Sequence, residues 1–176
     1  MASRVRVLLV AGSLQRKSAN RALLELLAEM RDDVTFVTAL PLGEVPYYDS
    51  DLESAPPAAV TRWRDQLRTA DAIVIASPEY GHGMSGVLKN ALDWIVRSGE
   101  LQEKPVAATC AAQGKGRGLL GIASLVQTLR AIDARVVWSS PVEVPRNSIG
   151  PDGRIDDAGT RSSGRELLET LIRSLA

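Results

Sequence analysis

The chain has 176 residues, 45% of them hydrophobic, and its 21 basic and 21 acidic side chains give no net charge. That length suits one domain with a full core. The charge balance argues against a nucleic-acid binder and against a carrier that meets redox partners through a strong charge field. We find no apolar run of about 18 residues that would span a membrane and no apolar signal segment. We therefore expect a cytoplasmic protein with neither membrane nor nucleic-acid partners.

The chain has one cysteine, Cys110, and one histidine, His82. Cys110 lies in an apolar run, which favours a small buried side chain over a reactive thiol. His82 has no Ser-His-acid or Cys-His partner set near it in the sequence, which favours an exposed loop histidine. One histidine and one cysteine do not make a conventional zinc site. We expect no metal and no catalytic side chain that acts as a nucleophile.

Hydrophobic periodicity predicts five strands that alternate with five helices. The strands are expected at 5–10, 34–38, 72–76, 106–111 and 136–138, and the helices at about 20–30, 60–70, 86–96, 119–132 and 164–175. Ser18 or Asn20 would cap the first helix, and a capping box, Ser163 to Glu166, would begin the last. The irregular segment 41–57 is long enough to be functional or packed over something. This pattern predicts a single doubly wound α/β domain, 1–176, with helices on both faces of the sheet.

Three glycine-rich loops follow the first, third and fourth strands, at 12–20, 77–86 and 112–118. In an open parallel sheet, ligands bind beyond the carboxyl ends of the strands. Since the unusual residues of the chain gather in these three loops, we expect them to form one site.

The first loop has the groups that a phosphate needs. It offers the hydroxyls of Ser13 and Ser18, the amide of Asn20, the charge of Arg16 and the N–H groups of a helix start. It matches neither the mononucleotide P-loop nor the Gly-x-Gly-x-x-Gly turn. From residue types alone, an ordinary capped polar turn explains it equally well.

The second loop has the shape of a ligand platform. Pro78 and Gly81 set its backbone, and Tyr80 places an aromatic ring at the edge of a crevice. Its glycines let a flat ligand approach the main chain closely. Glu79 is either a general base or a structural acceptor, and a lone carboxylate at a strand end favours the second interpretation.

Four segments together resemble the NAD(P)H-dependent FMN reductase family: GSLQRKSAN at 12–20, SPEY at 77–80, GVLKNALDW at 86–94 and PYYDSDLE at 46–53. This is the flavodoxin-like group that includes chromate- and quinone-reducing flavoenzymes and azoreductases. The resemblance runs from about residue 5 to residue 138. It implies a five-stranded parallel sheet in the order 2-1-3-4-5.

The resemblance also implies a site for FMN. The phosphate would lie on the first loop and the flavin ring on the second, with a contribution from the third. The implied contacts are Ser13, Gln15, Arg16, Ser18 and Asn20 for the phosphate, Pro78, Glu79, Tyr80 and Gly81 for the ring, and Gln113 and Gly114 from the third loop. Gln15 and Ser85 stand where the family commonly has arginine and proline.

By the same resemblance, FMN would take a hydride at N5 from NAD(P)H and pass electrons to a quinone, flavin, azo or metal-oxyanion acceptor. Donor and acceptor would share one open face of the ring, which predicts ping-pong kinetics. NADPH is the favoured donor, and a cation for its 2′-phosphate would come from Arg16, Lys115 or Arg117.

Two other functions stay open: an FMN-binding electron carrier, and a paralogue that binds flavin weakly and reduces nothing.

The apolar residues of 87–96 cover an arc of roughly 200° on a helix. That arc is wider than a sheet contact needs, so either a neighbouring helix or a partner subunit covers it. The resemblance favours the partner and implies a homodimer or homotetramer.

Overall fold

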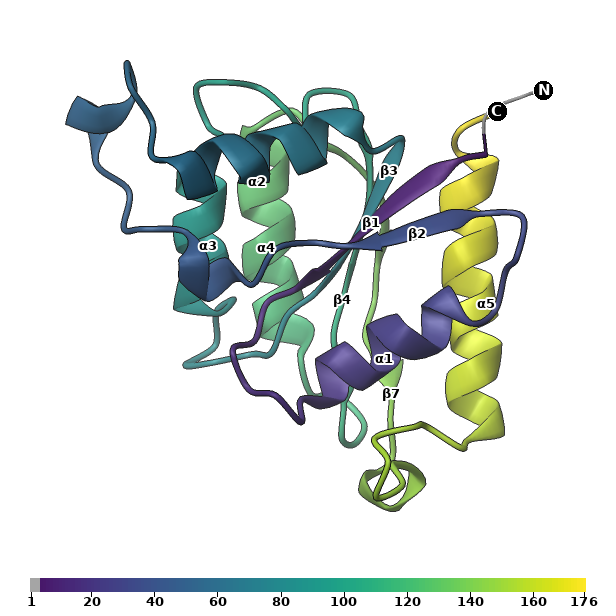
Figure 1. Cartoon of the computed structure of the whole chain (residues 1–176). Coiled ribbons are helices and arrows are strands. Elements are labelled where there is room, and N and C mark those ends of the chain that lie inside the picture. The colour runs from purple at the N-terminus through teal and green to yellow at the C-terminus, as the bar shows by residue number, and fades with distance from the viewer. Residues whose placement is uncertain (1–3) are drawn as a thin grey trace.

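Five parallel strands form the central sheet of the structure, a computed structural model that describes residues 4–176 (Figure 1). Their order is β2-β1-β3-β4-β6. The strands are β1 (Arg6–Ala11), β2 (Thr35–Thr38), β3 (Ala72–Ala76), β4 (Pro105–Thr109) and β6 (Arg135–Ser139). Since β6 is the fifth strand of this sheet along the chain, the flavodoxin-like order 2-1-3-4-5 is confirmed.

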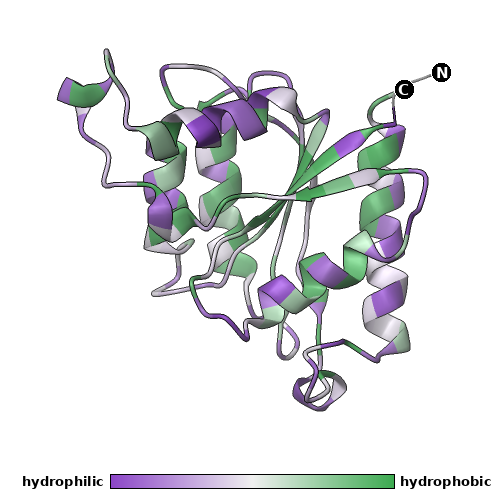
Figure 2. Cartoon of the chain, viewed as in Figure 1, coloured by the Kyte–Doolittle hydropathy of each residue, from purple (hydrophilic) through white to green (hydrophobic). Residues whose placement is uncertain are grey.

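Helices cover both faces of the sheet, as expected. On one face lie α1 (Ala19–Ala28) and α5 (Ala158–Arg173); on the other lie α2 (Ala58–Thr69), α3 (Gly86–Asp93) and α4 (Leu119–Ala131) (Figure 1). Successive side chains of a strand point to opposite faces. Accordingly, Leu8 packs among α2, α3 and α4, whereas its neighbour Leu9 packs against α1 and α5. The inner parts of the strands are therefore apolar on both faces, which Figure 2 shows as a green centre.

A second, two-stranded parallel pair was not expected from the sequence. Beyond Thr109 the chain leaves β4 at Cys110 and forms β5 (Ala111–Ala112), which pairs with β7 (Val142–Glu143). The side-chain oxygen of Asn20 accepts a 2.8 Å hydrogen bond from the N–H of Ala111. The predicted strand 106–111 is therefore two elements, and the second is fastened to the start of α1.

The predicted helix caps differ from those in the structure. Helix α5 begins at Ala158, where Asp157 accepts a 2.7 Å hydrogen bond from the N–H of Thr160. The predicted capping box at Ser163 is wrong, because Ser163 lies inside this helix. Ser18 does occupy the N-cap position of α1, but its side chain makes no capping bond. Asn20, inside the first turn, bonds Ala111 instead.

The segment 41–57, here called the arm, projects from the body of the molecule beyond α2 and α3 (Figure 1). It contains the 3-10 turns η1 (Leu42–Glu44) and η2 (Ser50–Leu52). The side-chain amide of Asn90, in α3, forms two hydrogen bonds to the arm. Its Oδ1 accepts from the Tyr48 N–H at 2.9 Å, and its Nδ2 donates to the Pro46 carbonyl at 2.9 Å. The Nε1 of Trp94 donates to the same carbonyl at 2.8 Å. The expectation that this segment packs over another element is confirmed.

The arm also explains the wide apolar arc of residues 87–96. Trp94 and Ile95 are 0% and 1% exposed within the single chain, whereas Val96 is 51% exposed. The ring of Tyr48 meets that of Trp94 edge-on at 5.1 Å between centroids. Most of the arc is therefore covered by the chain itself, so the arc alone gives no argument for a partner subunit.

None of the helices in residues 4–176 combines the length and the apolar character needed to cross a bilayer.

Candidate functional site

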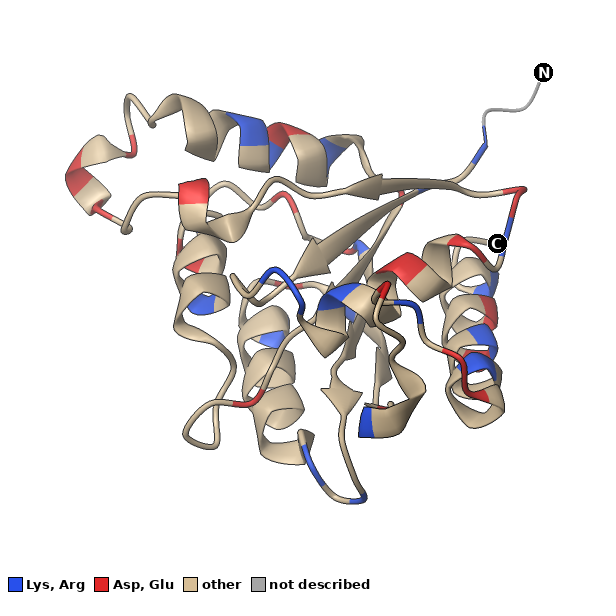
Figure 3. Cartoon of the chain, turned by 60° about the horizontal axis from the view of Figure 1, so that its bottom comes forward, with Lys and Arg blue, Asp and Glu red and all other residues tan. Residues whose placement is uncertain are grey.

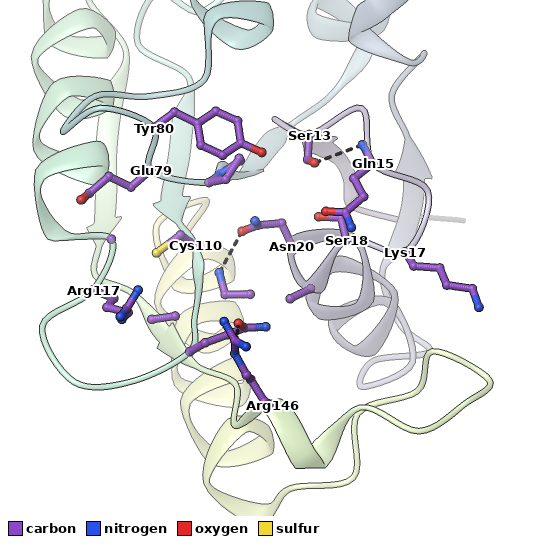
Figure 4. A pocket seen from close by; sticks show the side chains of 16 residues that line it. Ser13, Gln15, Lys17, Ser18, Asn20, Glu79, Tyr80, Cys110, Arg117 and Arg146 are labelled. Atoms are coloured by element: carbon purple, nitrogen blue, oxygen red, sulfur yellow. Dashed lines mark hydrogen bonds between the residues drawn. The ribbon is translucent and has the colours of Figure 1, made fainter.

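A cleft of about 620 Å³ opens at the carboxyl ends of β1, β3 and β4, within the usual size range of ligand pockets (Figure 4). All three glycine-rich loops contribute to it, as expected from the clustering of their unusual residues. The cleft is lined by Ser13, Gln15, Lys17, Ser18, Ala19, Asn20, Pro78, Glu79, Tyr80, Cys110, Ala111, Ala112, Gln113, Arg117, Gly118 and Arg146.

The wall formed by the first loop carries three buried polar side chains, Ser13, Ser18 and Asn20, each less than 9% exposed. The hydroxyl of Ser13 accepts a 3.2 Å hydrogen bond from the N–H of Gln15, which bends the loop. Ser18 makes no capping bond, so its hydroxyl is available to a ligand at the positive end of α1. A buried hydroxyl beside the first N–H groups of a helix suits an anion.

The charged side chains that line the cleft also favour binding of an anion. Lys17, Arg117 and Arg146 line it, and Glu79 is the one carboxylate of the lining. In Figure 3 blue segments lie on the loops at this edge, whereas the arm shows only red. Arg146 is held in place because its Nε donates to the Oε1 of Gln113 at 2.8 Å. The cleft is therefore cationic in a chain with no net charge.

Glu79 is a structural acceptor, as the sequence favoured. Its Oε2 accepts a 2.8 Å hydrogen bond from the N–H of Gly121, in the first turn of α4. A Cβ at position 121 would lie 2.9 Å from the Cβ of Glu79, so glycine is required for this close approach. His82 has a side chain 81% exposed, 3.8 Å from Glu79. The carboxylate ties the second loop to α4 and is not placed as a base.

Cys110 lies buried in the wall between β4 and β5. Gly118 faces its Sγ so closely that a Cβ at 118 would overlap the sulfur, and its φ of 84° also favours glycine. Burial, and secondarily the charge of Glu79, raises the pKa of Cys110 to about 11. At neutral pH this side chain is a thiol, so it brings no negative charge into the cleft.

The structure brings together most of the residues expected at the site. Eight of them line the cleft: Ser13, Gln15, Ser18, Asn20, Pro78, Glu79, Tyr80 and Gln113. Arg16 lines an adjoining groove instead. Gly81 and Gly114, with φ of 55° and 136°, shape the turns behind Tyr80 and Gln113 without lining the cleft.

Three cleft residues with obvious chemistry were not expected there. Lys17 belongs to the first loop, and its charge beside Ser18 was a signal that sequence reasoning could have used. Arg117 was considered only for the 2′-phosphate of NADPH. Arg146 comes from the irregular passage after β6, which has no recognisable pattern.

The sequence matches the family model for NADPH-dependent FMN reductase over residues 5–146. The chain belongs to this family. An NAD(P)H-dependent FMN reductase of Pseudomonas aeruginosa is 32% identical over 180 residues, spanning 99% of this chain and 95% of that protein. A quinone reductase of Escherichia coli K12 is 33% identical over 168 residues, spanning 91% and 89%.

A solved structure agrees with this assignment at the level of the fold. FerB, a flavoenzyme NAD(P)H:(acceptor) oxidoreductase from Paracoccus denitrificans, superposes with a TM-score of 0.83 at 22% identity and covers 97% of this chain and 98% of its own. The chain is an oxidoreductase of the FMN reductase family, and the cofactors implied by that family are FMN and NAD(P)H.

Proposed function

We propose that this protein binds FMN in the cleft and reduces a small acceptor with electrons from NAD(P)H. The acceptor class is a quinone, free flavin, azo compound or metal oxyanion. The observation that carries the proposal is the buried hydroxyl of Ser18, which makes no capping bond at the start of α1 and opens onto a cationic cleft.

The residues of the cleft fit FMN. Ser18, Asn20 and Lys17 would hold the phosphate with the N–H groups of α1. Pro78 and Tyr80 would border the ring. The one carboxylate of the lining, Glu79, is held by the N–H of Gly121 at the start of α4. When bound, FMN supplies the hydride acceptance and the electron transfer of the reaction.

The protein's own contribution is placement and charge. Cys110 stays protonated, and Arg117 and Arg146 offer positive charge near the third loop. Tyr80 is 60% exposed, so the mouth of the cleft stays open beside it. Both donor and acceptor have to reach this one cleft, which supports the alternating, ping-pong order.

We also propose a homodimer or homotetramer. Tyr47 on the arm is 91% exposed, and Leu52 and Val96 are 40% and 51% exposed. The arm, fixed to α3 by Asn90 and Trp94, presents Tyr47 and Leu52 in a defined position, and Val96 lies just after α3; an interface needs such fixed apolar side chains. Sedimentation that shows only monomer at micromolar concentration would contradict the proposed oligomer.

A cytoplasmic location is also part of the proposed function. It is supported by a single buried cysteine and no disulfide.

The test is reconstitution of the purified protein with FMN. We expect a bound flavin spectrum that NADPH bleaches under anaerobic conditions and that a quinone restores. Binding without bleaching would favour the electron carrier. No binding at micromolar FMN would favour the paralogue that has lost its flavin.

A further inference from the structure

A second cavity, of about 730 Å³, adjoins the cleft at the start of α1. We call it the groove. It shares Lys17, Ser18 and Ala19 with the cleft, so the two cavities meet where the FMN phosphate would lie. Its remaining lining comes from the first loop, from α1 and from the turn at 149–153: Arg16, Arg21, Ala22, Glu25, Ile149, Gly150, Pro151, Asp152 and Gly153.

The turn that forms the far wall of the groove is fixed in place. Ile149 and Ile155 form an antiparallel bridge, and the N–H of Gly150 donates to the carbonyl of Arg154 at 2.9 Å. The guanidinium of Arg154 also pairs with Glu29 near the end of α1, at 3.1 Å. The groove is therefore a built feature between two connected elements.

The lining of the groove is divided by chemistry. Arg16, Lys17 and Arg21 gather near the cleft, and none of them forms an ion pair with a carboxylate among residues 4–176. Glu25 and Asp152 add carboxylates, which accept hydrogen bonds from hydroxyl or amino groups. In a ligand with a phosphate, a sugar and a flat base, the phosphate would meet the cations, and the sugar hydroxyls or the amino group of the base would meet the carboxylates.

We propose that the groove binds the adenosine half of the nicotinamide donor, with Arg16 and Arg21 holding the 2′-phosphate of NADPH. The proposal rests on the proposed function, because the nicotinamide ring must lie against flavin in the cleft. The other half of the dinucleotide then extends beyond the ring, and the groove is a cavity that adjoins the cleft. Arginine is the residue best suited to hold a phosphate at two points.

The other cavity that adjoins the cleft does not fit a nucleotide. It measures about 200 Å³, below the usual size of ligand pockets, and none of its lining residues is charged. It lies on the side of Leu14, Ser85 and Val87. Of these two cavities, the groove is therefore the one whose size and charge suit a phosphorylated half of a dinucleotide.

The three cationic side chains that the sequence offered for the 2′-phosphate lie in different places. Arg16 lines the groove, whereas Arg117 lines the cleft across from Lys17 (Figure 4). Lys115 lines neither cavity. Arg21, in the first turn of α1, was not considered from the sequence and becomes the best residue to change, since it touches the groove and not the cleft.

The experiment uses 2′,5′-ADP as a probe of the adenosine half, with binding followed by calorimetry in FMN-reconstituted and flavin-free protein. The variants are Arg21→Ala, Arg21→Lys and a matched surface control, Arg130→Ala on α4. The KM for NADPH is compared with that for 1-benzyl-1,4-dihydronicotinamide, a hydride donor without an adenosine half. FMN affinity, measured by fluorescence, should be equal in all variants.

We expect Arg21→Ala to raise both the Kd of 2′,5′-ADP and the KM for NADPH about tenfold, as the loss of one charged phosphate contact would. Arg21→Lys should recover part of this loss. Arg130→Ala, and all kinetics with the benzyl donor, should be unchanged.

Unchanged affinity of Arg21→Ala for 2′,5′-ADP would overturn the proposal, as would a loss seen in Arg117→Ala but not in Arg21→Ala. Failure of the proposed function looks different. In that case FMN does not bind or NADPH does not bleach it, while 2′,5′-ADP binding to the flavin-free protein still tests the groove.

Discussion

The cleft and the arm both carry many polar side chains, but those side chains are used in opposite ways. At the arm, the amide of Asn90 and the indole N–H of Trp94, both from the α3 side, are bonded to main-chain groups of the arm. In the cleft, the hydroxyl of Ser18 makes no capping bond and Lys17 has no ion pair within residues 4–176. Satisfied polar groups indicate architecture, and available ones indicate a ligand.

The contrast changes the meaning of the most specific sequence motif. GVLKNALDW at 86–94 follows the loop of the cleft, yet only Gly86 and Val87 come near it, in the small adjoining cavity. Asn90 and Trp94 hold the arm. A motif can therefore mark a family through its architecture while the ligand contacts lie in shorter, less distinctive segments.

The largest expected effect is on the arm. Asn90→Ala removes the partner of the Tyr48 N–H and one of the two donors to the Pro46 carbonyl, which should lower the free energy of unfolding by about 2 to 3 kcal/mol. Urea unfolding measures this, and limited proteolysis should cut the arm faster. FMN affinity of the folded protein should not change.

Asn20→Ala is the matched variant on the cleft side, because it too removes an amide that bonds a main-chain group, the N–H of Ala111. It should weaken both stability and FMN binding. If the two asparagine variants behave alike in FMN affinity, the distinction between the two regions does not hold.

The next effect concerns pH. Unfolded chains lose the Cys110 proton near pH 9.0, whereas the buried thiol keeps it until about pH 11. The folded state therefore binds more protons in this window, so stability should fall as the pH rises from about 9 to about 11, by at most about 2 to 3 kcal/mol. Urea unfolding of wild type and Cys110→Ala across this range measures the difference. A decline of the same size in both would remove Cys110 as its cause.

A smaller effect tests the availability of Ser18. An N-cap serine normally contributes about 1 kcal/mol to helix stability, but this one makes no capping bond. Ser18→Ala should change the unfolding free energy by less than about 0.5 kcal/mol and weaken FMN about tenfold. The contrasting variant is Asp157→Ala, which should lower stability and leave FMN binding intact. Equal losses of stability in the two would mean that Ser18 is an ordinary cap.

The smallest effect lies at Ser85, the N-cap of α3. Its φ of −64° is one that proline adopts, and its Oγ is buried without a partner in the described residues. Ser85→Pro removes only a long 3.4 Å hydrogen bond to Ser77 and should raise stability by about 0.5 to 1 kcal/mol. Thermal unfolding would show this, and a lowered Tm would mean that the loop is strained in a way the dihedral angle does not reveal.

Local pattern predicted the parallel sheet and the three loops, because buried strands and glycine-rich turns have short-range signatures. The strand order came from the resemblance to the FMN reductase family. It did not predict β5, since the apolar run 106–112 continues through Cys110 with no break in composition. It placed the start of α5 too late, because Ala158 and Gly159 add nothing to an apolar stripe and the cap Asp157 precedes them.

The remaining errors come from contacts between distant residues. Pro46 and Tyr48 cover Trp94 from more than 45 positions away, so the exposed arc inferred from helix geometry could not be corrected from the helix alone. Arg146 reaches the cleft through its bond to Gln113, 33 residues earlier. Only the folded chain reveals such partners.

The bonds that join the cleft walls have a consequence for the kinetics of cofactor loading. Asn20 ties the first wall to β5, Glu79 ties the second to α4, and Gln113 ties the third to Arg146. A ligand that enters such a preorganised socket orders few side chains, so little conformational entropy is lost. FMN association should then follow a single exponential whose rate rises linearly with FMN concentration, and variants of these three ties should add a slow phase.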